Sequence, residues 1–130
     1  MLLGSAGAAS AQSPLKYSVS VVPQFSPTQL HQEWAPVLAR LSQDTGMTLE
    51  LKVSPTIPLF EAEFLKGAPD FAYMNPYHAV MAKQAHGYQP LLRDRQGLTG
   101  ILLVHKNSPY TEASDLKDQT LGFPAPNAFG

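Results

Sequence analysis

One pattern constrains the fold of this chain more than any other: an apolar strand, a polar turn and a helix follow one another three times before Gly87. In two of the repeats a capping side chain stands directly before a proline, as Ser26-Pro27 and Asn75-Pro76. Proline is favoured at the first position of a helix, and serine and asparagine oxygens accept hydrogen bonds from the first turn. Strands that alternate with helices pair in parallel through right-handed crossovers. The sequence therefore predicts an α/β fold with a mostly parallel sheet flanked by helices.

The spacing of apolar residues sets the bounds of the expected elements. Alternating or continuous apolar runs predict strands at 15–22, 47–53 and 70–74. Capping residues, helical spacing and closing glycines predict helices at 27–45, 58–66 and 76–86. Later apolar runs predict further strands at 88–92, 98–105 and 120–123, with one capped helical turn at 114–118.

The charge balance and the lack of cysteine exclude several kinds of function. Nine basic residues against ten acidic ones give a net charge of −1, and neither sign is gathered into a run. Nucleic acids and anionic membranes are bound by clustered basic residues, so neither is expected as a partner. A chain without cysteine has no disulfide framework, no thiolate metal site and no cysteine nucleophile.

The first eleven residues are small and apolar and end in Ala9-x-Ala11, which is the pattern of a signal-peptidase site. We interpret residues 1–11 as the remnant of a secretory signal peptide, whose basic start is missing. The alternative is a flexible leader rich in alanine, glycine and serine. A secretory signal predicts a protein exported to the periplasm.

A ligand site is expected at one edge of the sheet. Because parallel strands end at the same edge, the turns at 23–28, 54–57 and 74–77 should line one crevice. Each turn leads into a helix amino end, which favours a small anionic or strongly polar ligand. The candidate contacts are Pro23, Gln24, Ser26, Thr56, Ile57, Tyr73, Asn75 and Tyr77. The alternatives are that Ser26 and Asn75 only cap helices, and that the tyrosines belong to the core.

Catalytic, metal and cofactor sites are not expected. The histidines at 31, 78, 86 and 105 lack the short spacings of metal ligands, although His78 could reach the crevice from the first turn of its helix. Glu61 and Glu63 do not share a helix face and are expected on a solvated surface. The sequence has no nucleophile elbow, phosphate-binding loop or dinucleotide fingerprint. We expect no enzyme activity, no metal and no cofactor.

Over residues 17–130 the chain resembles the amino-terminal part of the phosphate/phosphite/phosphonate-type periplasmic solute-binding proteins of ABC transporters. The resemblance depends on motifs whose order and spacing match the family. They are Val22-Pro23, the segment 34–38, the block 67–73 running into Pro76, the segment 102–104 before Ser108, and the segment 114–123.

The resemblance implies two α/β lobes of the type II periplasmic-binding-protein fold, joined by a hinge. Residues 12–104 would then form the first lobe, and 105–130 would cross the hinge and begin a truncated second lobe. Tyr73 matches a ligand-facing tyrosine of the family, Thr99 falls near a hydroxyl-bearing cleft position, and Asn127 lies where the family has a loop rich in serine and threonine. That loop has no hydroxyl here, and Ile57 stands where phosphonate binders have a tyrosine. Both departures argue against phosphonate as the ligand, because a buried oxyanion needs hydrogen-bond partners.

The expected function is that of the extracytoplasmic solute-binding component of an ABC importer. It would act as a monomer, hold a small polar or anionic ligand between its lobes and deliver it to the transporter permease. The resemblance points to a phosphonate-like or phosphate-like oxyanion. The alternative is the periplasmic ligand-sensing domain of a membrane histidine kinase or diguanylate cyclase. An α/β enzyme would need a clustered nucleophile and base, which these residues do not provide.

Overall fold

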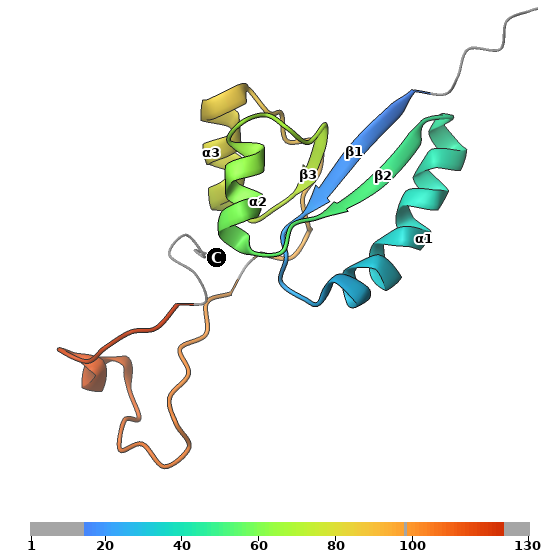
Figure 1. Cartoon of the computed structure of the whole chain (residues 1–130). Coiled ribbons are helices and arrows are strands. Elements are labelled where there is room, and N and C mark those ends of the chain that lie inside the picture. The colour runs from blue at the N-terminus through green and yellow to red at the C-terminus, as the bar shows by residue number, and fades with distance from the viewer. Residues whose placement is uncertain (1–14, 98, 124–130) are drawn as a thin grey trace, which may run out of the picture.

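Strands and helices alternate along the first part of the chain as the sequence predicts. The computed structural model describes residues 15–97 and 99–123 (Figure 1). Its elements, in chain order, are β1 (Lys16–Val21), α1 (Pro27–Thr45), β2 (Thr48–Val53), α2 (Ile57–Phe64), β3 (Phe71–Tyr73), α3 (Pro76–His86) and the 3-10 turn η1 (Ala113–Leu116).

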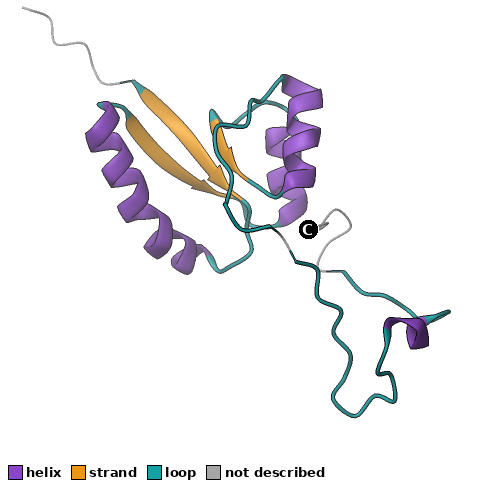
Figure 2. Ribbon diagram, turned by 180° about the vertical axis from the view of Figure 1, so that it is seen from behind, coloured by secondary structure: helices purple, strands orange, loops and turns teal. Residues whose placement is uncertain are grey.

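The three strands form one parallel sheet in the order β2-β1-β3. In this register Val21 of β1 lies between Val53 of β2 and Tyr73 of β3, so the carboxyl ends of all three strands meet at one edge. The predicted parallel α/β lobe is therefore confirmed. In both views α1 runs beside β2, and α2 and α3 lie together beside β3 (Figures 1 and 2).

The helices cover opposite faces of the sheet. The Trp34 ring of α1 packs against Tyr73, which pairs with Val21, so α1 lies on the face of these two residues. The next side chain, Val22, points to the other face because side chains alternate along a strand. There it joins a core cluster made by α2 and α3, which comprises Val22, Phe60, Phe64 and Ala82, with Ile57, Met74, Met81 and Tyr88 packed against it.

Each helix starts with a side-chain cap. The oxygens of Ser26, Thr56 and Asn75 accept hydrogen bonds from the N–H groups of Gln29, Leu59 and His78, at 3.3, 3.3 and 2.7 Å. Ser26 and Asn75 are thus the predicted caps, and α2 begins one residue earlier than predicted because Thr56 caps it. Gly46 and Gly87 end α1 and α3 with φ of 72° and 70°, in the left-handed region that glycine adopts without strain.

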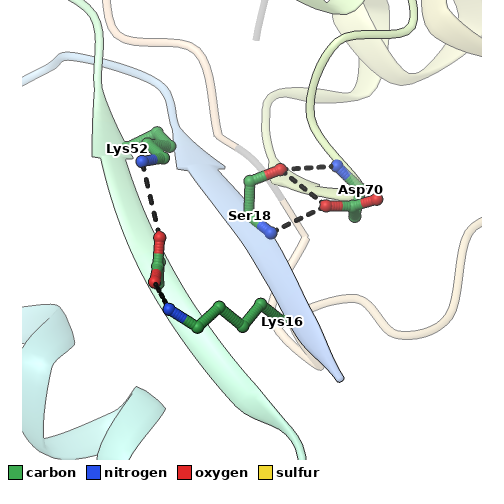
Figure 3. Close-up of polar contacts among 5 residues, drawn as sticks. Lys16, Ser18, Lys52 and Asp70 are labelled. Atoms are coloured by element: carbon green, nitrogen blue, oxygen red, sulfur yellow. Dashed lines mark hydrogen bonds and ion pairs between the residues drawn. The ribbon is translucent and has the colours of Figure 1, made fainter. Parts of the chain in front are cut away.

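A polar clamp joins β3 to the central strand. Asp70 Oδ2 accepts hydrogen bonds from the backbone N–H and the hydroxyl of Ser18, both at 2.7 Å, and the Asp70 N–H donates to the Ser18 hydroxyl at 3.0 Å (Figure 3). The backbone N–H of Ser18, followed by its hydroxyl, holds the pKa of Asp70 below its ordinary value. Beside this clamp Glu50 pairs with Lys16 and Lys52, each at 3.6 Å, on the exposed part of the sheet.

The strands predicted after Gly87 are wrong. Residues 88–92, 99–105 and 120–123 have no regular secondary structure, and Leu98 lies outside the described residues. A strand needs a hydrogen-bonded neighbour as well as an apolar sequence, and within the described ranges only β1, β2 and β3 pair. Consequently Leu92 and Leu103 are 84% and 86% exposed. The segment after Gly100 extends away from the sheet, and the predicted helical turn near 114–118 is present as η1 (Figure 1).

Two further expectations concern parts of the chain without a described structure. The proposed signal remnant at 1–11 and the candidate contact Asn127 both lie outside the described residues. In the part that is described, no helix is both long enough and apolar enough to cross a membrane.

Candidate functional site

A hollow of about 250 Å³ opens at the carboxyl edge of the sheet, between the ends of β1 and β3 and the first turns of α1. Its position is the one expected for ligands in open parallel sheets. Two of the predicted contacts, Gln24 and Tyr73, line it directly. The full lining is Val21, Val22, Gln24, Phe25, Leu30, Glu33, Trp34 and Tyr73.

Aromatic side chains form much of the wall. The rings of Trp34 and Tyr73 are 4.9 Å apart between centroids and inclined at 55°, and Phe25 stands in the turn after β1. Tyr73 is 51% exposed and Phe25 is 52% exposed. The alternative that Tyr73 is a core residue is therefore wrong, because half of its surface is exposed to solvent.

Among the described residues of the lining, one is charged. Glu33 lies on the second turn of α1, and its Oε1 accepts a hydrogen bond from the Gln29 side-chain amide at 2.9 Å. No lysine, arginine or histidine is among the described residues that line the hollow. The local charge is thus negative, in contrast to the positive helix ends that the sequence emphasised.

The three caps lie at the same edge but do not line the hollow. Ser26, Thr56 and Asn75 each use a side-chain oxygen to hold the third N–H of its helix. Proline occupies one of the first two positions of every helix, which removes a second N–H from each first turn. The helix ends therefore offer fewer backbone donors to a ligand than the sequence pattern indicates.

The remaining described candidates lie outside the hollow. Ile57 packs against the core cluster of α2 and α3. Pro23 is partly buried in the turn after β1, Tyr77 is 40% exposed on the first turn of α3, and Thr99 is exposed and outside the hollow. Among all the candidates that are described, the structure brings only Gln24 and Tyr73 into one hollow.

The expectations for His78 and Glu61 are corrected. His78 is fully buried between the rings of Phe60 and Phe64, so it does not reach the crevice. Its Nε2 lies 2.9 Å from Glu61 Oε1, and the Glu61 side chain is only 14% exposed. The packing of α3 against α2 buries His78 and Glu61, and the spacing within one helix does not reveal it. Glu63 is exposed as expected, and its Oε2 accepts a hydrogen bond from the buried Ser54 hydroxyl at 2.6 Å.

Sequence reasoning missed several residues of the hollow, above all Glu33, Trp34 and Phe25. A signal for two of them was available. Leu30, Glu33 and Trp34 are spaced at i, i+3 and i+4, so they share one face of the helix that follows the first strand. That face starts at the edge where Tyr73 was expected. In the described part of the chain, no group of three potential metal ligands is found.

Comparison with known proteins identifies the family. Residues 19–130 match the family described as ABC transporter, phosphonate, periplasmic substrate-binding protein. The chain belongs to this family. Its members are periplasmic binding proteins of transporters and not enzymes. The resemblance drawn from the sequence is thus confirmed.

A solved structure supports the fold. A binding protein component of an ABC phosphonate transporter from Pseudomonas aeruginosa matches with a TM-score of 0.52 and 19% sequence identity. The match covers 56% of this chain and 24% of the other, so the chain spans about a quarter of the length of that protein. No curated protein sequence matches the chain at a significant level.

Proposed function

We propose that this chain acts as the extracytoplasmic solute-binding component of an ABC importer, and that it holds a small polar solute at the carboxyl edge of its sheet. The observation that supports the proposal is the aromatic-walled hollow at that edge, in a chain of the phosphonate-binding family. The family's ligand class makes a phosphonate-like or phosphate-like oxyanion the first solute to test. Export to the periplasm and delivery to a permease are part of the same proposal.

The division of the chain follows from this role. Residues 12–104 form the first lobe, and residues 105–130 cross the hinge and begin the second. The solute would be enclosed when the two lobes close, because it binds the closed form more tightly than the open one. An open hollow walled by half-exposed rings suits such a mechanism, since closure buries the surface that Tyr73 and Phe25 leave exposed.

Binding can be measured through the single tryptophan of the chain, Trp34, which lies in the hollow. Titration with methylphosphonate and with inorganic phosphate should change the fluorescence of Trp34 in a saturable manner. Tyr73→Ala should weaken this binding about tenfold or more, because it removes one ring of the wall. Leu59→Ala is the matched control, since Leu59 on α2 is 50% exposed and lies outside the hollow. Equal affinity in the two variants would argue against this site.

The reading frame beyond Gly130 separates the importer component from the sensing domain. A frame that continues into an apolar span of ~20 residues followed by a kinase or cyclase domain would contradict the importer proposal. A frame that completes a second lobe without such a span would support it.

A further inference from the structure

The charge of the hollow differs from what an oxyanion requires. Among residues 15–97 and 99–123, its lining contains one carboxylate and three aromatic rings, from Glu33, Phe25, Trp34 and Tyr73, and no cationic side chain. Within the same ranges Glu33 has no ion-pair partner, and its carboxylate accepts a hydrogen bond from the amide of Gln29. A negative oxygen of a ligand placed here would meet a carboxylate with no basic residue to offset it.

The sign of this charge indicates the sign of the bound group. Glu33 is exposed, so solvent screens part of its field, but a carboxylate repels an oxyanion and attracts a cation at any screening. We infer that the solute carries a cationic amino or quaternary ammonium group, which enters the hollow beside Glu33 and against the rings of Trp34 and Tyr73.

The aromatic walls support the same ligand chemistry. A cation within about 6 Å of a tryptophan or tyrosine ring is attracted to the negative face of the ring, and more strongly when water is excluded. The Trp34 and Tyr73 rings pack against each other with centroids 4.9 Å apart and form one aromatic wall of the hollow. A hollow of about 250 Å³ has room for a compact ammonium group with its methyl substituents.

A purely structural role for Glu33 explains less. The contact between Gln29 and Glu33 is an i, i+4 pair on α1, and such pairs stabilise a helix only slightly. It does not explain why Trp34, the next residue, forms part of the same hollow together with the half-exposed Phe25 and Tyr73. The combination of a carboxylate with aromatic faces is a composition that recognises ammonium groups.

This inference rests on the proposed function and deepens it, so the test separates the two. The probes are choline, its neutral isostere 3,3-dimethylbutan-1-ol, and methylphosphonate, each titrated into the whole 130-residue chain while Trp34 fluorescence is recorded. Choline should bind about tenfold more tightly than the alcohol, because the two differ only in the charged nitrogen. Glu33→Gln should reduce that preference to about threefold or less, since it keeps the size of the side chain and removes its charge.

Glu50→Gln is the matched control, because Glu50 lies on β2 outside the hollow and the substitution is the same. It should leave the preference for choline unchanged. Equal affinity for choline and the alcohol would overturn the inference, and saturable binding of methylphosphonate in the same experiment would leave the proposed function standing. A preference for choline that persists in Glu33→Gln would also overturn the inference. A preference for choline without any binding of methylphosphonate would support the inference and remove the oxyanion from the proposed function.

Discussion

Replacing Asp70 by asparagine tests what holds β3 at the edge of the sheet. Asp70 is the residue before β3, and its carboxylate and backbone N–H make three hydrogen bonds to Ser18 of β1. β3 itself has only three residues, the last of which is Tyr73. The clamp therefore fixes the short strand that carries one wall of the hollow.

The magnitude follows from the bonds that lose their charge. A hydrogen bond to a charged acceptor contributes about 1.5–3 kcal/mol, and one between neutral groups about 0.5–1.5 kcal/mol. Two bonds are converted from the first kind to the second in Asp70→Asn. Because Asp70 is exposed, solvent screening reduces this difference, and we expect a loss of about 1 kcal/mol in the free energy of unfolding at pH 7.

The loss should depend on pH. The N–H and hydroxyl of Ser18 hold the pKa of Asp70 in the folded state below 3.8. A carboxyl group with a depressed folded pKa stabilises the fold fully above its unfolded pKa, and this contribution disappears as the pH falls through the folded pKa. Below that pH the wild type and the Asp70→Asn variant should have nearly the same stability.

Urea unfolding followed by Trp34 fluorescence measures both effects. Asp44→Asn is the control, since the Asp44 carboxylate accepts a hydrogen bond from Arg40 Nε at 2.8 Å between two exposed side chains. An exposed pair of this kind contributes about 0.5 kcal/mol or less. The reasoning would be refuted if Asp70→Asn reduced the free energy of unfolding by no more than Asp44→Asn at pH 7. It would also be refuted if the loss in Asp70→Asn were the same at pH 7 as at a pH below the folded pKa of Asp70.

Three further predictions concern the packing and the backbone. Phe60→Ala should reduce the free energy of unfolding in urea by about 3–5 kcal/mol, because Phe60 is fully buried. Leu59→Ala should reduce it by less than about 1 kcal/mol, because Leu59 is half exposed. Similar losses in the two variants would contradict the assigned core. Gly67→Ala should be more destabilising than Gly46→Ala in the same assay. Both glycines have positive φ, but only at Gly67 would an added Cβ lie 3.0 Å from His86 Cγ. A larger loss in Gly46→Ala would count against this contact. Hydrogen exchange should show slow amides in β1 and fast amides at 101–104, where no strand pairing protects them; protection at 101–104 would contradict the described structure.

Features that depend on neighbours along the chain were predictable from the sequence. Ser26 and Asn75 cap their helices, and Gly46 and Gly87 end them, because each of these contacts lies within one helical turn. The parallel order of the three strands follows from the alternation of elements. Features that need a partner distant in sequence were not predictable in this way. The apolar run at 101–104 has the composition of a strand, but no described segment pairs with it.

The same distinction explains the site. Tyr73 could be placed at the sheet edge because it ends a strand, and Gln24 because it follows one. Glu33 and Trp34 were missed because they belong to the body of α1, and only the position of that helix along the sheet brings them to the edge. The buried pair of His78 and Glu61 was missed for a similar reason, since it joins two helices whose packing no local pattern specifies.

The anionic ligand expected from the sequence and the cationic group inferred from the hollow are compatible once the backbone donors are counted. In each first turn a proline removes one N–H and the cap accepts from the third, so the helix ends offer an anion fewer backbone donors than the sequence pattern indicates. The partial charge of a helix end is about half an elementary charge and is screened by solvent. Glu33 is also exposed to solvent, but it brings a full charge to the wall of the hollow and therefore has the larger effect on the sign there. A solute with both charges could place its anion near the turns and its cation beside Glu33, and it would use each part of the edge for the charge that it favours.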